Sequence, residues 1–121
     1  MSSRKKERLE VILTERALSD LCEIEDFSIQ KWGRKTTDRY LDDLQSALVR
    51  LVENPAILRL EPDLSPGLYF YRVRQHFFVC DVGENFIGVL TLIHTSMDLP
   101  TRLAELEPRL IAEANMLRKK R

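Results

Sequence analysis

The 121 residues of this chain are enough for one domain with its own hydrophobic core, and no apolar stretch is long enough to cross a bilayer. Apolar residues make up 44% and charged residues 31% of the chain, a balance that excludes a disordered or fibrous protein. The formal net charge is zero, but four basic residues stand among the first eight and four more occupy 118–121, so the part between them is acidic. Because a body that binds nucleic acid usually has a basic face, we interpret the two basic ends as solvated tails.

The N-terminal segment and the cysteines indicate the compartment. The segment MSSRKKERLEV lacks the apolar core of a secretory signal. Cys22 and Cys80 lie too far apart for a metal-binding motif. We expect both to be free, mostly buried thiols of a cytoplasmic protein. No metal cluster and no phosphate-binding glycine loop is indicated, and we expect no cofactor.

The first predicted element is a strand over residues 9–14, LEVILT, which leads directly into a helix. Thr14 is a good N-cap residue, and from Glu15 onward apolar residues recur every three or four positions. Gly33 is expected to end this helix after Trp32, because glycine readily adopts the backbone conformation that closes a helix.

A second helix follows at once and has the clearest apolar stripe in the chain. Thr36 or Thr37 could cap its start. Asn54-Pro55 ends it, because the residue before a proline disfavours helical backbone. The connecting turn has only a few residues, so the two helices must form an antiparallel hairpin.

The second half of the chain predicts a meander of strands and a last helix. A proline-rich loop over 55–67 precedes strands at 68–74, 76–82 and 86–93. The third strand is apolar on both faces, which is typical of a central strand or of one whose second face is covered. We expect Pro100 to open the last helix and Pro108 to break it into two pieces. The order β-α-α-β-β-β-α predicts an α+β fold in which an antiparallel sheet packs against the helical hairpin.

The two faces of this sheet should differ. The hairpin can cover only one face, so we expect the other to be open or covered by a partner. Strand alternation should point Arg72 and Arg74 from the same face. An unpaired guanidinium is costly to bury, which favours the open or partner-facing side for both arginines.

Two histidines and an aspartate complete the candidate site. His94 stands where the last strand leaves the sheet and could transfer a proton or contact RNA. A histidine there can also bond the backbone of the following turn with help from Asp98, and spacing alone favours that structural role. His76 opens a strand beside the arginines, and Asp98 is interpreted first as the N-cap of the last helix.

Taken together, these segments resemble the toxins of the RelE/ParE superfamily of type II toxin–antitoxin modules. The resemblance rests on LTERALSDLCEIEDFSIQKWG, RYLDDLQSALVRLVENP, the meander YFYRVRQHFFVCDVGENFIGVLTLIH and its ending HTSMDLP. It covers roughly residues 9–103 and implies a single RelE/ParE-like domain there, between a basic N-terminal tail (1–8) and a C-terminal helical extension with a basic end (104–121). It also implies a cognate antitoxin that covers exposed toxin surface. The family's last strand ends in a histidine and an acidic turn, which His94 and Asp98 match.

The superfamily contains two activities, and the resemblance leaves both open. RelE-type toxins cleave mRNA on the ribosome, and Arg72, Arg74 and His94 would be the catalytic set of such a nuclease. ParE-type toxins poison DNA gyrase without chemistry of their own. Arg72 and Arg74 are the only cationic residues between 68 and 93, and a nuclease must neutralise phosphate charge, so the ParE-like reading is favoured. Its target-binding candidates are Arg72, Arg74, His76, His94 and Asp98. A non-toxic binding module of the same fold is a third alternative, and a homo-oligomer stays possible.

Overall fold

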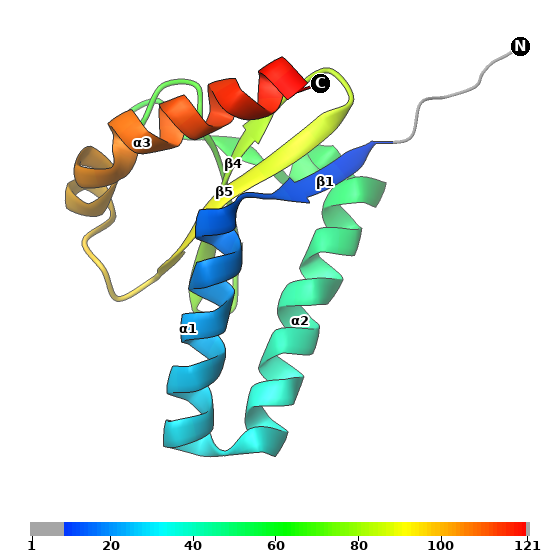
Figure 1. Ribbon diagram of the computed structural model, residues 1–121, viewed down its shortest axis with the longest axis vertical. Helices are drawn as coiled ribbons and strands as arrows, with labels where there is room; N and C mark the ends of the chain where they lie inside the picture. The colour runs from blue at the N-terminus through cyan, green and yellow to red at the C-terminus, as the bar shows by residue number, and fades with distance from the viewer. Residues whose placement is uncertain (1–8, 121) are drawn as a thin grey trace, which may run out of the picture.

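The computed structural model describes residues 9–120 and places three helices around one sheet (Figure 1). The elements are β1 (Glu10–Leu13), α1 (Glu15–Trp32), α2 (Arg34–Glu53), the short 3-10 helix η1 (Pro55–Ile57), β2 (Arg59–Leu60), β3 (Tyr69–Val73), β4 (His76–Val82), β5 (Phe86–His94) and α3 (Leu99–Lys120). The predicted α+β class and the order of the main elements are confirmed. The two-residue strand β2, inside the proline-rich loop, was not predicted.

The sheet has the strand order β1-β5-β4-β3-β2. β1 pairs in parallel with β5, with Glu10 opposite Phe86, whereas the other neighbours are antiparallel. The sheet is therefore mixed rather than wholly antiparallel. β5 lies between β1 and β4, as predicted for a central strand, and residues Phe86 to Ile93 are buried because the hairpin covers one face and α3 the other.

The helical hairpin begins and turns at two well-defined residues. Thr14 is the N-cap of α1, as predicted, because its hydroxyl accepts a hydrogen bond from the Ala17 amide at 3.0 Å. Gly33, with φ of 89°, closes α1 and is itself the N-cap of α2. The predicted cap at Thr36 or Thr37 is therefore wrong. A single left-handed glycine completes the reversal, and α2 has already begun at Arg34.

The second face of the sheet is covered by α3, which crosses it on the side opposite the hairpin (Figure 1). The buried side chains of α3 are Leu103, Leu106, Leu110 and Ala114, and they form one cluster with Leu68, Phe70, Val79, Leu90 and Ile93. The expectation of an open or partner-covered face is therefore wrong here. α3 is also continuous. Pro108 is exposed and removes one backbone donor without ending the helix.

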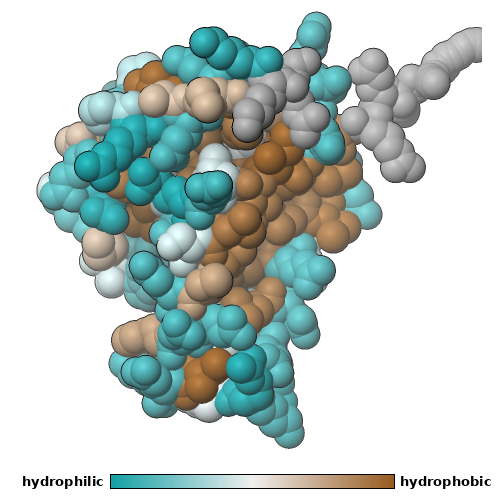
Figure 2. All heavy atoms as spheres, viewed as in Figure 1, coloured by the Kyte–Doolittle hydropathy of each residue, from teal (hydrophilic) through white to brown (hydrophobic). Residues whose placement is uncertain are grey.

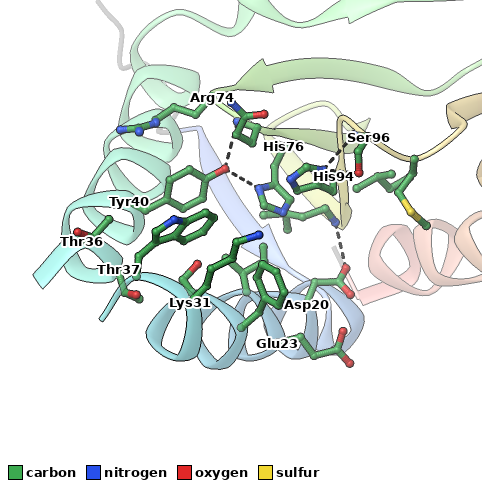
Figure 3. Close-up of a pocket in the computed structure, with 18 of the residues that line it drawn as sticks. Asp20, Glu23, Lys31, Thr36, Thr37, Tyr40, Arg74, His76, His94 and Ser96 are labelled. Atoms are coloured by element: carbon green, nitrogen blue, oxygen red, sulfur yellow. Dashed lines mark hydrogen bonds between the residues drawn. The ribbon is translucent and has the colours of Figure 1, made fainter. Parts of the chain in front are cut away.

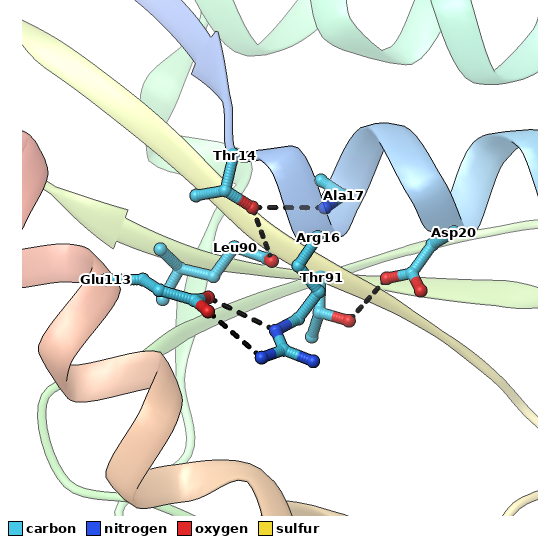
Figure 4. A network of polar contacts seen from close by, with 7 residues as sticks. All are labelled: Thr14, Arg16, Ala17, Asp20, Leu90, Thr91 and Glu113. Carbon is cyan, nitrogen blue, oxygen red and sulfur yellow. Dashed lines mark hydrogen bonds and ion pairs between the residues drawn. The ribbon is translucent and has the colours of Figure 1, made fainter.

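Polar contacts hold α3 to the rest of the fold. Arg16 donates twice to Glu113, at 3.2 and 2.9 Å, from α1 to α3 (Figure 4). Arg118 donates to both oxygens of the buried Asp81 carboxylate on β4, at 3.0 and 2.8 Å. Part of the basic C-terminal end thus has a partner inside this chain. The basic segment 1–8 and Arg121 lie outside the described residues.

Several large apolar side chains on the hairpin are exposed, namely Leu18, Phe27, Trp32, Val49 and Val52. Figure 2 shows apolar side chains gathered over β1 and the space between the helices. Cys80 is buried as predicted, but Cys22 is exposed, because Leu21 and Ile24 take the inward positions on that turn of α1. Within residues 9–120, no helix is long and apolar enough to span a membrane.

Candidate functional site

A groove of about 990 Å³ lies between the hairpin and the end of β5 (Figure 3). One wall is α1 with Phe27 and Trp32, and the other is formed by the β3–β4 turn and the end of β5. Arg74, His76 and His94, three of the predicted site residues, line it. We call the part of the groove around Phe27 and Trp32 its hairpin end, and the part around Arg74, His76 and His94 its sheet end.

His76 is the buried residue at the sheet end. It is 8% exposed, and its Nδ1 lies 2.6 Å from the Tyr40 hydroxyl. That hydroxyl accepts a bond from the Gln75 amide at 3.1 Å, which leaves its own proton for His76. Burial, and secondarily the charge of His94, lower the pKa of His76 to about 4. His76 is therefore neutral at pH 7, and burial likewise raises the pKa of Tyr40.

His94 is exposed and packs its ring edge-on against that of His76, with 5.0 Å between the ring centroids. Its Nδ1 accepts the Ser96 amide at 3.0 Å, and the Ser96 hydroxyl lies 2.8 Å away. The imidazole thus bonds the following turn, which is the geometry of the structural role. Because Nδ1 is an acceptor, the neutral ring carries its proton on Nε2.

Asp98 takes no part in that turn. Its carbonyl accepts the Arg102 amide at 2.9 Å, which is the first bond of α3, and its carboxylate accepts the Thr101 hydroxyl. Asp98 therefore lies at the N-cap position of α3. It is not among the residues that line the groove.

The two arginines point to different sides of the sheet, which corrects the same-face prediction. Arg74 lies in the two-residue β3–β4 turn with φ of 54°, so strand alternation ends before it. Its guanidinium lies 5.1 Å from the Tyr40 ring centroid and pairs with Asp43 of α2. Tyr71 and Val73 pack with the hairpin, so Arg72 between them faces the α3 side, and its Nε donates to the Arg74 carbonyl at 3.1 Å.

Several groove residues were missed by sequence reasoning. Phe27 and Tyr40 recur at helical spacing with the apolar residues of α1 and α2, a pattern that by itself predicts core positions. A tyrosine in such a stripe was a usable signal, because a buried hydroxyl needs a partner. The pairing of β1 with β5 ends at Leu13 opposite Val89. Beyond that point the Asp20 carboxylate accepts hydrogen bonds from β5, from the Thr91 hydroxyl (Figure 4) and from the Leu92 amide at 3.0 Å. Within residues 9–120, no three His, Cys, Asp or Glu side chains are grouped as a metal site would require.

Comparison with known proteins identifies the family. The family model described as "ParE toxin of type II toxin-antitoxin system, parDE" matches residues 11–99. Toxin ParE of Escherichia coli is 32% identical over 96 residues, covering 78% of this chain and 92% of that protein. Toxin ParE1 of Mycobacterium tuberculosis is 32% identical over 93 residues, covering 76% and 95%.

A solved structure supports the same fold. It is described as a chromosomal ParDE TA system from P. aeruginosa and matches with a TM-score of 0.65 over 74% of this chain and 98% of its own, at 16% identity. The family match ends at Leu99, where α3 begins. From the family model and the curated relatives, this chain belongs to the ParE toxin family of type II toxin–antitoxin systems.

Proposed function

We propose that this chain poisons DNA gyrase in the cytoplasm and is held inactive by a cognate antitoxin. Family membership supports the toxin assignment, and the similar structure comes from a system that pairs ParE with ParD. We infer the same class of protein partner for this chain. The proposal requires no chemistry from the toxin, only a surface that gyrase recognises.

The observation that favours gyrase over mRNA is the separation of the predicted nuclease residues. Arg72 faces the α3 side of the sheet, whereas Arg74 and His94 line the groove, and Arg74 is already paired with Asp43. A ribonuclease must place cations where negative charge develops on the phosphate. Arg72 and Arg74 are thus unsuited to stabilise one phosphate together with His94.

We place the gyrase contact at the sheet end of the groove. Arg74 and His94 are exposed there, and His76 holds the His94 ring from behind. Arg72 and Asp98 lie outside the groove, so we assign them no direct contact. Replacing His94 by Ala should weaken gyrase poisoning by about tenfold, or ~1.4 kcal/mol, as expected for a side chain that becomes buried near the centre of the complex.

The test is DNA topology with purified proteins. Supercoiled and relaxed plasmid are incubated with gyrase and the toxin, and both loss of supercoiling and trapped cleaved DNA are measured. Inhibition that is reduced in His94→Ala but retained in Arg109→Ala, an exposed arginine on α3, supports the proposal. Unchanged supercoiling and no trapped DNA contradict it.

One observation supports the ribonuclease alternative. Lys31 and His94 line the same groove, so a cation and an imidazole are available there. A translation reaction programmed with a defined mRNA tests it. Cleavage of that mRNA, lost in His94→Ala, would establish the nuclease instead.

A further inference from the structure

The hairpin end of the groove carries an exposed aromatic pair. Phe27 is 58% and Trp32 55% exposed, and their rings meet edge-on with 6.1 Å between centroids. The Lys31 ammonium lies 5.6 Å from the Phe27 centroid and 5.4 Å from that of Trp32. Large aromatic side chains exposed side by side are typical of the centre of a binding surface.

The unpaired charge at this end is mainly positive. Of the groove's charged residues, Asp20 is used by β5, Arg74 is paired with Asp43, and Arg102 is paired with Glu105. Lys31 and Arg39 line the groove and are exposed, and neither forms an ion pair within residues 9–120. Only the Glu23 carboxylate opposes them there. The groove therefore favours an occupant with carboxylates.

We propose that an acidic segment of the antitoxin binds at the hairpin end, with an apolar side chain against Phe27 and Trp32 and carboxylates beside Lys31 and Arg39. The antitoxin as occupant rests on the proposed function. The aromatic rings supply the apolar contact, and the two cations supply charge complementarity, which sets specificity and association rate.

This placement gives neutralisation a direct physical mechanism. The groove is continuous from Trp32 to His94, so a segment anchored at the hairpin end reaches toward the sheet end. Figure 3 shows that Lys31 lines the same groove as Tyr40, His76 and His94. A bound antitoxin would cover the surface that we assign to gyrase, and the two partners would compete.

Trp32 makes the experiment specific, because it is the only tryptophan in the chain. The probes are the antitoxin encoded by the adjacent reading frame, with any tryptophan replaced by Phe, and a tryptophan-free peptide of alternating Glu and Leu residues. Each is titrated against the toxin while Trp32 emission is recorded. We expect a shift to shorter wavelength and protection from iodide quenching as the indole is covered.

Charge reversal tests the cations. Lys31→Glu together with Arg39→Glu should weaken antitoxin binding by about tenfold or more at low salt, and by less at high salt, because exposed ion pairs are screened. Arg59→Glu with Arg109→Glu is the matched control, since both arginines are exposed on other elements. Lys31→Gln with Arg39→Gln, which avoids placing a new negative charge in the last turn of α1, should show a smaller loss in the same direction.

The outcomes are separable from those of the gyrase proposal. Variants that still poison gyrase but resist neutralisation support the inference. Unchanged antitoxin affinity, an unmoved Trp32 emission, or tighter binding of a Lys/Leu peptide than of the Glu/Leu peptide overturns it. If the wild-type toxin leaves gyrase unaffected, the target is wrong, and the binding result still decides where the antitoxin docks.

Discussion

The buried imidazole of His76 makes stability depend on pH. Its pKa falls to about 4 in the folded protein, from an ordinary value of 6.5. Between these values the unfolded chain binds a proton that the folded chain does not, so stability is lost as the pH falls below 6.5. We expect the free energy of unfolding to drop by about 2 kcal/mol between pH 7 and pH 5 from this residue. Urea unfolding of wild type and His76→Gln at both values measures it. Equal pH dependence in the two proteins contradicts the prediction.

A second single-residue prediction concerns Thr14, where the chain passes from the sheet to the hairpin. Its hydroxyl accepts the Ala17 amide and donates to the Leu90 carbonyl at 2.8 Å (Figure 4). Thr14→Ala removes a helix cap and a buried hydrogen bond to the Leu90 carbonyl, which should cost about 2 kcal/mol. Thermal unfolding compared with Thr36→Ala, an exposed threonine near the start of α2, isolates the effect. A loss no larger than that of the control would show that the cap is unimportant.

At the scale of elements, α3 shows where local patterns mislead. Its apolar spacing predicted a helix, and the buried leucines confirm it. Pro108 predicted a break, yet one missing donor on an exposed side is tolerated when leucines on both sides of it are buried. The surface that α3 covers could not be predicted from its sequence. The apolar side of a helix can pack against any exposed apolar surface, and the sequence does not say which one is near.

Gly88 allows α3 to approach β5 closely. A Cβ added at this position would lie 2.6 Å from a terminal methyl of Leu117. Gly88→Ala should therefore destabilise the fold by about 1 kcal/mol through overpacking, and Leu117→Ala should relieve part of that cost. Denaturant unfolding of the two single variants and the double variant forms the cycle. Strictly additive costs would show that the methyl has room to move.

For the whole molecule, the family resemblance and the order of elements could be obtained from the sequence. The caps at Thr14 and Gly33 and the burial of β5 followed from local chemistry. The parallel pairing of β1, the cover by α3 and the groove that Phe27, Trp32 and His94 share depend on contacts between distant segments. Strand alternation also failed at Arg74, because the turn's backbone conformation, and not the pleat, directs that side chain.

The pairing of β1 with β5 joins residues about 76 positions apart, because Glu10 lies opposite Phe86. During synthesis the hairpin can form early, but its first strand has no neighbour until nearly three quarters of the chain has been made. Translation that stops before β5 therefore yields a fragment that lacks His94 and the strand that joins β1 to β4, so one side of the groove is missing. Under the proposed function, a chain can therefore poison gyrase only after β5 has been synthesised, and the strand order sets that delay.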